Sequence, residues 1–459
     1  MAAPGPSAAW HGLWRSVGYN RILRLDPDGY TLYTASASHA CVVEQGSARE
    51  FRDAFDRVGL DHARGRLTLH HAHDLTRYEF ERWPSWDARC RLHESRCDDA
   101  RTNFEAFREV FAENYAFFER RRIDWKALCA SVQPRIAGAA SLETLLDALE
   151  ALIAPLADLH VYVATPARKV RCASSARGPR AALQALFGLP TPMLSARSSV
   201  EAIAGRLRET LLRDFAGTLG NFRQAGNGVL AWGTLCPDIG YLSLLRMFGF
   251  ASSEMARRAD DLPHRLSEAG PFMGEDMAAL AHILDDALND LSMHKALIID
   301  ARLNGGGFDR AGMLLCERLI DEPRVAYTKK ARWRDGFTEP QAFTLTPARG
   351  TRFSRPVFLL TSALTVSAGE VFALAMSALP RVTLLGEPTQ GILSDNLFHR
   401  LPCGWEVSLS NEVYECLLGH CYEAEGVPPA ERLPQLGSAD LLSDLRAGLR
   451  IAADRASAI

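Results

Sequence analysis

Ser367 lies where an apolar strand pattern passes into a helical one, in the segment that runs from Phe358 to Phe372. In the first turn of a helix, backbone N–H groups lack intrahelical acceptors and the helix dipole is positive. An oxyanion that formed beside a serine there would meet donors already in position. Ser367 is therefore a candidate nucleophile, and the alternative is that it only caps the helix.

Three consecutive glycines, Gly305 to Gly307, follow Asn304 and the buried-strand pattern of residues 296–300. Consecutive glycines let backbone N–H groups approach a ligand without an intervening side chain. The run lacks the G-x-G-x-x-G spacing of a dinucleotide site and the Lys-Ser/Thr ending of a P-loop. It predicts either a flexible turn or one half of an oxyanion hole, with the N–H of Ala368 as the other half.

A serine hydroxyl needs a base to lose its proton near neutral pH. The usual bases are a histidine with a carboxylate or a desolvated lysine. The loop that follows the helix and the next strand, residues 386–394, contains no lysine. The base must therefore come from another part of the chain.

The elements that position these groups follow from periodicity. Residues 19–80 alternate short β-prone runs with turn signals, which predicts a small antiparallel meander. From Asp98 the apolar spacing becomes helical and predicts three helices, and residues 157–163 turn to a β pattern. From Gly228 onward strands alternate with helices, which indicates a mainly parallel sheet with its reactive loops at the strand C-termini.

The length and these patterns predict four parts. A chain of 459 residues is too long for a single core. The expected parts are a small β-rich N-terminal domain over residues 1–95, a helical subdomain over 96–164, a partly helical connecting segment over 165–236, and an α/β core over 237–459.

Composition and charge exclude several classes of partner. Hydrophobic residues make up 47% and charged residues 23%, as in ordinary globular proteins, and a net charge of −3 gives no general attraction to nucleic acid or anionic membranes. The basic stretch from Arg168 to Arg180 lacks aromatic residues for base stacking and is expected to be an irregular connection. The chain shows no signal-peptide pattern and no bilayer-spanning run, so we expect a cytoplasmic protein.

The candidate metal ligands do not converge. Three histidines and an aspartate lie between His70 and Asp74, but neighbouring residues in a strand point to opposite faces. The ten cysteines form no C-x-x-C pair, and Cys416 and Cys421 would bridge only in an exported protein. We expect no metal and no cofactor.

Seven stretches, taken in order over roughly residues 100–440, make the chain similar to the tail-specific and tricorn-type serine peptidases, a family that also includes the interphotoreceptor retinoid-binding protein modules. They are Phe111-Ala-Glu-Asn-Tyr-Ala with Asp124-Trp125, Leu156-Ala-Asp-Leu-His160, Ile239-Gly-Tyr, Ile299-Asp-Ala-Arg-Leu-Asn-Gly-Gly-Gly307, Thr365-Val-Ser-Ala-Gly-Glu370, Gly386-Glu-Pro-Thr-Gln-Gly391 and Tyr422-Glu-Ala-Glu-Gly-Val-Pro-Pro429. The resemblance implies a ClpP/crotonase-like α/β catalytic domain, beside the helical subdomain and the small N-terminal antiparallel β domain.

The resemblance implies a nucleophile at Ser367, with Gly306 and the amide of Ala368 as oxyanion donors. Tail-specific members carry a lysine base in the loop after the position of Gly391. This chain has Ile392 and other residues without a basic group there.

The tricorn-like arrangement instead implies a base at His160 and a catalytic glutamate at Glu423, with Glu425 as its rival. Asp158 would either orient His160 or cap the preceding turn. The residue before the histidine is Leu159, where the tricorn pattern has a hydroxyl residue, so a second hydroxyl in the relay is not identified.

The implied activity is that of a serine peptidase acting on peptides or unfolded polypeptides, with no nucleic-acid or membrane partner and with a homo-oligomer left open. No PDZ-like segment separates the helical subdomain from the α/β core, so targeting of tagged chain ends through such a module is not predicted. Two alternatives remain: a non-catalytic module that binds an apolar ligand on the same fold, and an acyl-CoA enzyme that uses the glycine loop as its oxyanion hole.

Overall fold

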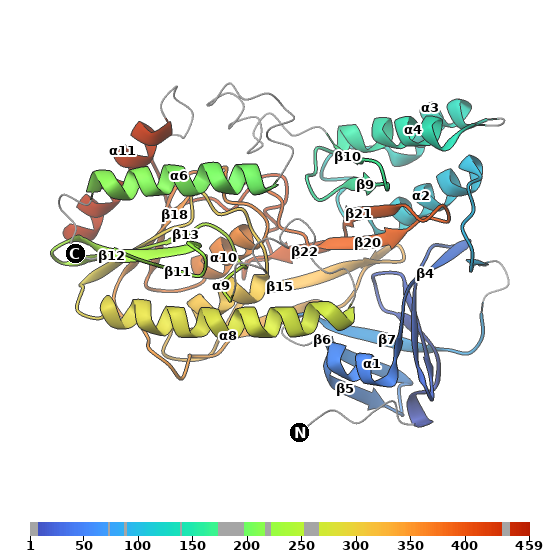
Figure 1. The fold of residues 1–459 in the computed structure, drawn as a ribbon, viewed down its shortest axis with the longest axis horizontal. Helices are drawn as coiled ribbons and strands as arrows, with labels where there is room; N and C mark the ends of the chain where they lie inside the picture. The colour runs from blue at the N-terminus through green and yellow to red at the C-terminus, as the bar shows by residue number, and fades with distance from the viewer. Residues whose placement is uncertain are drawn as a thin grey trace.

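The computed structural model describes residues 8–71, 74–86, 90–137, 140–172, 197–215, 222–251, 266–433 and 441–459. Figure 1 shows a β-rich N-terminal domain at one end of the molecule and an α/β core at the other. The predictions for His73 and for the basic stretch beyond residue 172 lie outside the described residues.

The N-terminal domain is an eight-stranded sheet in the order β5-β6-β7-β1-β2-β3-β4-β8. All pairings are antiparallel except that of β4 with β8. The meander predicted over residues 19–80 is therefore present within a larger sheet. The elements are β1 (Gly12–Ser16), β2 (Arg21–Asp26), β3 (Gly29–Ala35), β4 (His39–Ser47), α1 (Ala48–Ala54), β5 (Phe55–Asp61), β6 (Arg66–His71), β7 (Arg77–Trp83) and β8 (Arg91–His93).

Three helices follow: α2 (Ala100–Asn114), α3 (Trp125–Ile136) and α4 (Leu142–Ile153). Each begins at a side chain that accepts a hydrogen bond from the helix's first turn, namely Asp99, Asp124 and Ser141. Phe104, Phe107 and Phe111 on the first helix are buried. This helix packs against the second, since the rings of Phe111 and Trp125 are 5.1 Å apart.

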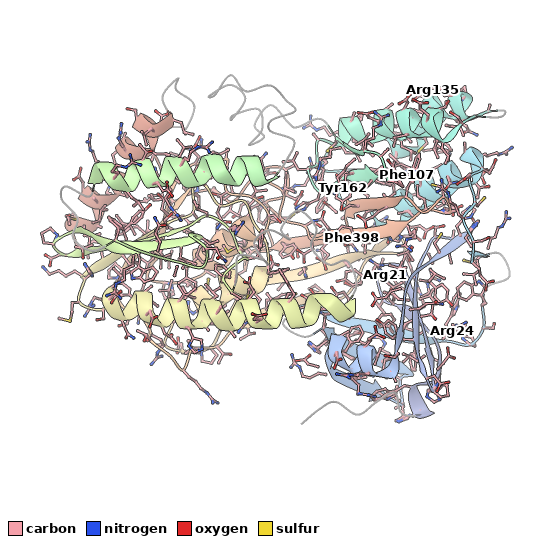
Figure 2. All side chains as sticks on the ribbon, in the orientation of Figure 1. Arg21, Arg24, Phe107, Arg135, Tyr162 and Phe398 are labelled. Carbon is pink, nitrogen blue, oxygen red and sulfur yellow. The ribbon has the colours of Figure 1, made fainter. Side chains whose placement is uncertain are left out.

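The chain then enters a four-stranded sheet that joins this helical subdomain to a distant segment. Its order is β10-β9-β21-β20, with β9 (Tyr162–Ala164), β10 (Lys169–Arg171), β20 (Asn396–Arg400) and β21 (Glu406–Ser410). Figure 2 labels Tyr162 of β9 and Phe398 of β20, two strands that β21 separates, and their ring centroids lie 6.4 Å apart. The strand after His160 is thus held by residues more than two hundred positions later in the chain.

The core sheet has seven strands in the order β11-β12-β13-β14-β18-β19-β23. The pairings from β13 to β23 are parallel, as predicted, whereas β11 and β12 form an antiparallel edge. Because β11 and β12 belong to this sheet, the core sheet begins before residue 237, the start that the sequence predicts for the α/β core. The strands are β11 (Arg223–Ala225), β12 (Leu230–Cys236), β13 (Ile239–Leu244), β14 (Ala296–Asp300), β18 (Val357–Thr361), β19 (Val382–Gly386) and β23 (Glu431–Arg432).

Helices cover both faces of this sheet, as Figure 1 shows for α6 and α8. One apolar cluster joins the sheet to α6 (Arg197–Phe215) and α11 (Leu441–Ser457). The other joins it to α8 (Leu266–Asp290), α9 (Asp309–Cys316) and α10 (Ala368–Ser377). Two buried faces explain why the central strands are continuous apolar runs.

An outer antiparallel group extends from the core: β15 (Arg324–Trp333), β16 (Gly336–Phe337), β17 (Gln341–Leu345) and β22 (Glu412–Glu415). All ten cysteines are free thiols, including Cys416 and Cys421. None of the helices in the described part of the chain combines the length and the apolar character that a bilayer crossing requires.

Candidate active site

Ser367 occupies a strained position between β18 and α10. Its φ is 57° and its ψ is −125°, a region that residues with a side chain rarely adopt. Sharp strand-to-helix turns of this kind expose a side chain at the end of a sheet. Ser367 directly precedes the helix, as the sequence predicts.

The glycine loop lies against this serine. A Cβ atom on Gly306 would stand 2.8 Å from the Cβ of Ser367 and 2.7 Å from the carbonyl oxygen of Val366, so a side chain cannot fit. Gly306 also has a φ of 82°, which favours glycine. The predicted proximity of the two motifs is therefore present.

The backbone N–H groups of Ala368 and Gly306 differ in whether they are free to bind an oxyanion. The N–H of Ala368, at the start of α10, has no acceptor among the described residues. The N–H of Gly306 donates to Oδ1 of Asn304 at 3.0 Å. In this conformation the Ala368 amide is open to an oxyanion, whereas the Gly306 amide is already engaged.

Glu370 connects the nucleophile to the loop that begins at Thr389. Its fully buried carboxylate accepts from the N–H of Ser367 at 3.1 Å, the hydroxyl of Thr389 at 2.6 Å, and the N–H groups of Gly391 and Ile392 at 2.5 and 2.9 Å. Burial raises the pKa of Glu370 to about 7, against the lowering effect of these donors. The carboxylate fixes the backbone on both sides of the site.

His160 stands at the other end of that loop, with its ring against the backbone of Ser394. Its Nδ1 is buried and has no hydrogen-bond partner among the described residues. Burial lowers the pKa of His160 below 6.5, although Asp158 and Asp395 act in the opposite direction. The imidazole is therefore neutral near pH 7, which is the form that accepts a proton.

Asp158 holds the backbone in front of His160. Its Oδ1 accepts the backbone N–H of His160 at 3.0 Å, and its Oδ2 accepts the hydroxyl of Tyr115 at 3.0 Å. The sequence leaves two roles open for Asp158, orienting His160 or capping the preceding turn. These contacts are those of a residue that caps the turn.

Glu423 is 2% exposed and anchors the end of the same loop. Its Oε2 accepts the N–H groups of Leu393 and Ser394 at 2.8 and 3.2 Å. Its Oε1 accepts from Nη2 of Arg121 at 3.0 Å. Burial raises the pKa of Glu423, and the charge of Asp158 adds to this effect while Arg121 opposes it.

Glu425, the rival glutamate, faces solvent. It pairs with Arg120 at 2.8 Å and with His420 at 3.2 Å, and its side chain is 58% exposed. The structure thus places Glu423, not Glu425, beside the loop.

Arg121 joins the glutamate to the histidine segment. Besides Glu423, it donates to the carbonyl of Ala157 at 3.0 Å, and it lies 3.8 Å from Oδ2 of Asp158. Sequence reasoning missed Arg121, which carries no motif of its own. It also missed the roles of Glu370 and Asn304, although a carboxylate three residues after a serine and an asparagine before a glycine run are visible signals.

The loop from Gly391 to Ser394 is the common element of the site. Its first two amides bind Glu370, its last two bind Glu423, and its end contacts the ring of His160. Within the described residues no hydrogen bond joins Ser367 directly to His160 or Glu423. The same part of the chain contains no group of three or more side chains arranged to hold a metal ion.

Comparison with known proteins finds a family match in the C-terminal half of the chain. Residues 271–432 match the model of peptidase family S41. The chain contains a peptidase family S41 domain. This finding confirms the family resemblance read from the ordered motifs.

Two carboxyl-terminal-processing proteases are similar in sequence to this chain. The protein from Picosynechococcus sp. is 31% identical over 152 residues, which cover 32% of this chain and 35% of that protein. The protein from Synechocystis sp. is 30% identical over 172 residues, or 37% of each chain. The chain therefore spans little more than a third of the length of these relatives.

Solved structures show the same fold. A presumed peptidase from Parabacteroides merdae aligns with a TM-score of 0.59 and 22% identity, over 78% of this chain and 97% of that one. Mature CPAF complexed with lactacystin aligns with a TM-score of 0.50 and 14% identity, over 78% and 97% of the two chains. The α/β fold class predicted from the sequence is confirmed.

Proposed function

We propose that this protein is a serine peptidase that hydrolyses peptide bonds in peptides or unfolded polypeptides, with Ser367 as nucleophile, His160 as base and Glu423 as the carboxylate of the site. The observation that carries the proposal is the strained backbone of Ser367 at the start of α10, against a glycine loop and beside an open amide. The S41 domain and its carboxyl-terminal-processing relatives support the same reaction class.

In the proposed reaction, neutral His160 accepts the hydroxyl proton of Ser367 while the serine oxygen attacks the peptide carbonyl. The N–H of Ala368 binds the resulting oxyanion. A second donor would come from the glycine loop, where the Gly306 amide would turn from Asn304 to the oxyanion. The imidazolium then protonates the leaving amine, and His160 activates the water that releases the acyl group.

The His160 ring must approach Ser367 for these steps, and catalytic hydrogen bonds are commonly long before substrate binds. Glu423 acts in this scheme through the loop, because it fixes the amides of Leu393 and Ser394 against which the ring packs. A cytoplasmic location is a further part of the proposal, drawn from the sequence, which leaves the oligomeric state open.

A fluorophosphonate probe tests the proposal, because it modifies activated serines. We expect the wild-type protein to be labelled and Ser367→Ala to remain unlabelled, with peptide hydrolysis lower by about 10³-fold or more. Ser377→Ala, an exposed serine at the end of the same helix, is the matched control and should label normally. An unlabelled wild-type protein would favour the alternative of a non-catalytic module that binds an apolar ligand. Labelling that persists in Ser367→Ala would show that Ser367 is not the nucleophile.

A further inference from the structure

Tyr414 of β22 contacts two different loops of the candidate site through one hydroxyl group. The residue is 1% exposed, and its hydroxyl oxygen lies 3.0 Å from Oδ2 of Asp309 and 2.9 Å from Oδ2 of Asp395. Asp309 begins α9, shortly after the glycine loop. Asp395 follows Ser394, whose backbone contacts the ring of His160. None of the three polar side chains that meet here takes part in the reaction proposed above.

The geometry of this contact fixes the number of its protons. A phenol hydroxyl carries one hydrogen and donates it to only one of the two carboxylates. Nζ of Lys329 also donates to the hydroxyl oxygen of Tyr414, at 3.2 Å. The other carboxylate, if ionised, would place lone pairs against the lone pairs of this oxygen, so it is a favourable neighbour only when it carries a proton. Asp309 and Asp395 therefore share one proton, as close pairs of carboxylates do.

The surroundings of the two carboxylates indicate that Asp309 holds the proton. The side chain of Asp395 is 50% exposed and lies 3.3 Å from Nζ of Lys329, which favours its ionised form. Burial raises the pKa of Asp309 well above its usual range, and the charge of Asp395 adds to this effect while Lys329 opposes it. The dipole of α9 also opposes it, but weakly at an exposed first turn. The charged or titratable side chains that act on Asp309 from the outer strands are Tyr327, Lys329, Glu412 and Tyr414.

The outer strands hold Tyr414 in a fixed position. Tyr414 pairs in register with Lys329 of β15, and the two strands lie side by side in Figure 1. Nζ of Lys329 lies 3.1 Å from Oε2 of Glu412 and donates to the hydroxyl of Thr76 at 2.6 Å. The backbone N–H of Glu412 donates to the hydroxyl of Ser394 at 3.0 Å. The strand that carries Tyr414 therefore also binds the end of the loop that Asp395 follows.

We propose that Tyr414 is a positioning residue for the peptidase reaction. Its hydroxyl accepts a hydrogen bond from protonated Asp309 and donates one to ionised Asp395. This chain of hydrogen bonds sets the spacing between the glycine loop, which packs against Ser367, and the loop that contacts His160. Two ionised carboxylates around one hydroxyl would repel each other and separate the loops. The inference rests on the proposed peptidase function and deepens it by naming the group that joins its two halves.

Tyr414→Phe removes the hydroxyl and keeps the ring. We expect kcat to fall about tenfold with KM within about twofold of wild type, because Tyr414 is buried from the substrate while the spacing of the reacting groups depends on it. Tyr327→Phe is the matched control. Tyr327 is fully buried on the neighbouring strand, and its hydroxyl has no hydrogen-bond partner among the described residues, so its kcat should equal that of wild type. Steady-state hydrolysis of an unstructured peptide measures both variants.

Two substitutions of Asp309 test the shared proton. Asp309→Ala should lower kcat about tenfold near pH 7, and Asp309→Asn should restore most of it, because the asparagine amide donates to Tyr414 as the protonated carboxyl does. The wild-type kcat should fall at alkaline pH, where Asp309 loses its proton and faces Asp395 as a second charge. Asp309→Asn has no such proton to lose, so this fall should be absent. Asp335→Asn, a substitution of an exposed aspartate, is the control and should keep the alkaline fall.

Infrared difference spectroscopy of wild type against Asp309→Asn tests the same proton without turnover. A carboxylic-acid band that is present in wild type and absent in the variant supports the inference, and the lack of such a band in wild type overturns it. If Tyr414→Phe does not fold, the Asp309 variants and the spectra still decide the matter.

The outcome for Tyr414 is separable from the outcome for the activity. Wild-type hydrolysis that Tyr414→Phe leaves unchanged, or an alkaline fall that persists in Asp309→Asn, would overturn the positioning role and leave the peptidase standing. A wild-type protein that shows the carboxylic-acid band but neither hydrolyses peptides nor reacts with the fluorophosphonate would overturn the peptidase function, and the positioning role with it.

Discussion

The nucleophile side of the site and the base side are built in different ways. Ser367, Ala368 and Glu370 are near neighbours in sequence, and their geometry follows from one strand-to-helix turn. On the base side, Arg121 and Glu423 meet across 302 positions of sequence. The first arrangement depends on local backbone chemistry, whereas the second depends on the whole fold, so the two sides should respond differently to mutation.

The largest effect is expected on the base side, at His160. His160→Gln removes the proton acceptor and should lower kcat/KM by about 10²–10⁴-fold, the range for loss of a general base. The turn at Ser367 should stay intact, because its contacts are local. Steady-state hydrolysis checks the expectation, with exposed His62→Gln as the control, and wild-type rates in His160→Gln would contradict the proposed base.

Arg121→Met should destabilise the protein by about 3–5 kcal/mol, because Glu423 and Asp158 would lose a buried cation. Urea unfolding measures the effect. Arg101→Gln replaces a side chain that is 78% exposed and pairs with Glu105 on the surface, and it should change stability by less than about 1 kcal/mol. Equal effects of the two substitutions would mean that Arg121 does not organise the base side.

On the nucleophile side the sharpest test compares two adjacent glycines. Gly306→Ala forces a side chain into a left-handed backbone and against Ser367, which should cost about 1–3 kcal/mol of stability and at least about tenfold in kcat/KM. Gly305→Ala places its methyl group in open space and should be near wild type in both measurements. A Gly306→Ala protein with normal stability and activity would argue against a tight loop at the nucleophile.

The smallest effect concerns pH. Because burial lowers the pKa of His160 below 6.5, the imidazole stays neutral above that lowered value and is protonated only at more acidic pH. The acidic limb of the kcat/KM profile should therefore fall below pH 6.5, with activity lost as the pH drops through the pKa of His160. An acidic limb above pH 6.5 that is absent in His160→Gln would reverse this interpretation.

The same contrast separates what the sequence could predict from what it could not. Local sequence patterns indicate Ser367, the glycine loop and the alternating strands and helices, so all of them could be predicted. The choice between Glu423 and Glu425 depends on burial, which sequence neighbours two residues apart do not reveal. Arg121 belongs to no motif, because its importance comes from the carbonyl of Ala157 and the carboxylates of Glu423 and Asp158, which only the folded chain brings near.

The pairing of β9 with β21 sets the order in which this molecule can mature during synthesis. A ribosome releases the segment bearing His160 long before the strand that must lie beside it, residues 406–410, and Glu423 emerges later still. Domains that fold as they emerge can form early at the N-terminal end. The site itself stays unassembled until nearly the whole polypeptide has been made. It therefore cannot cleave the nascent chain or neighbouring chains during synthesis.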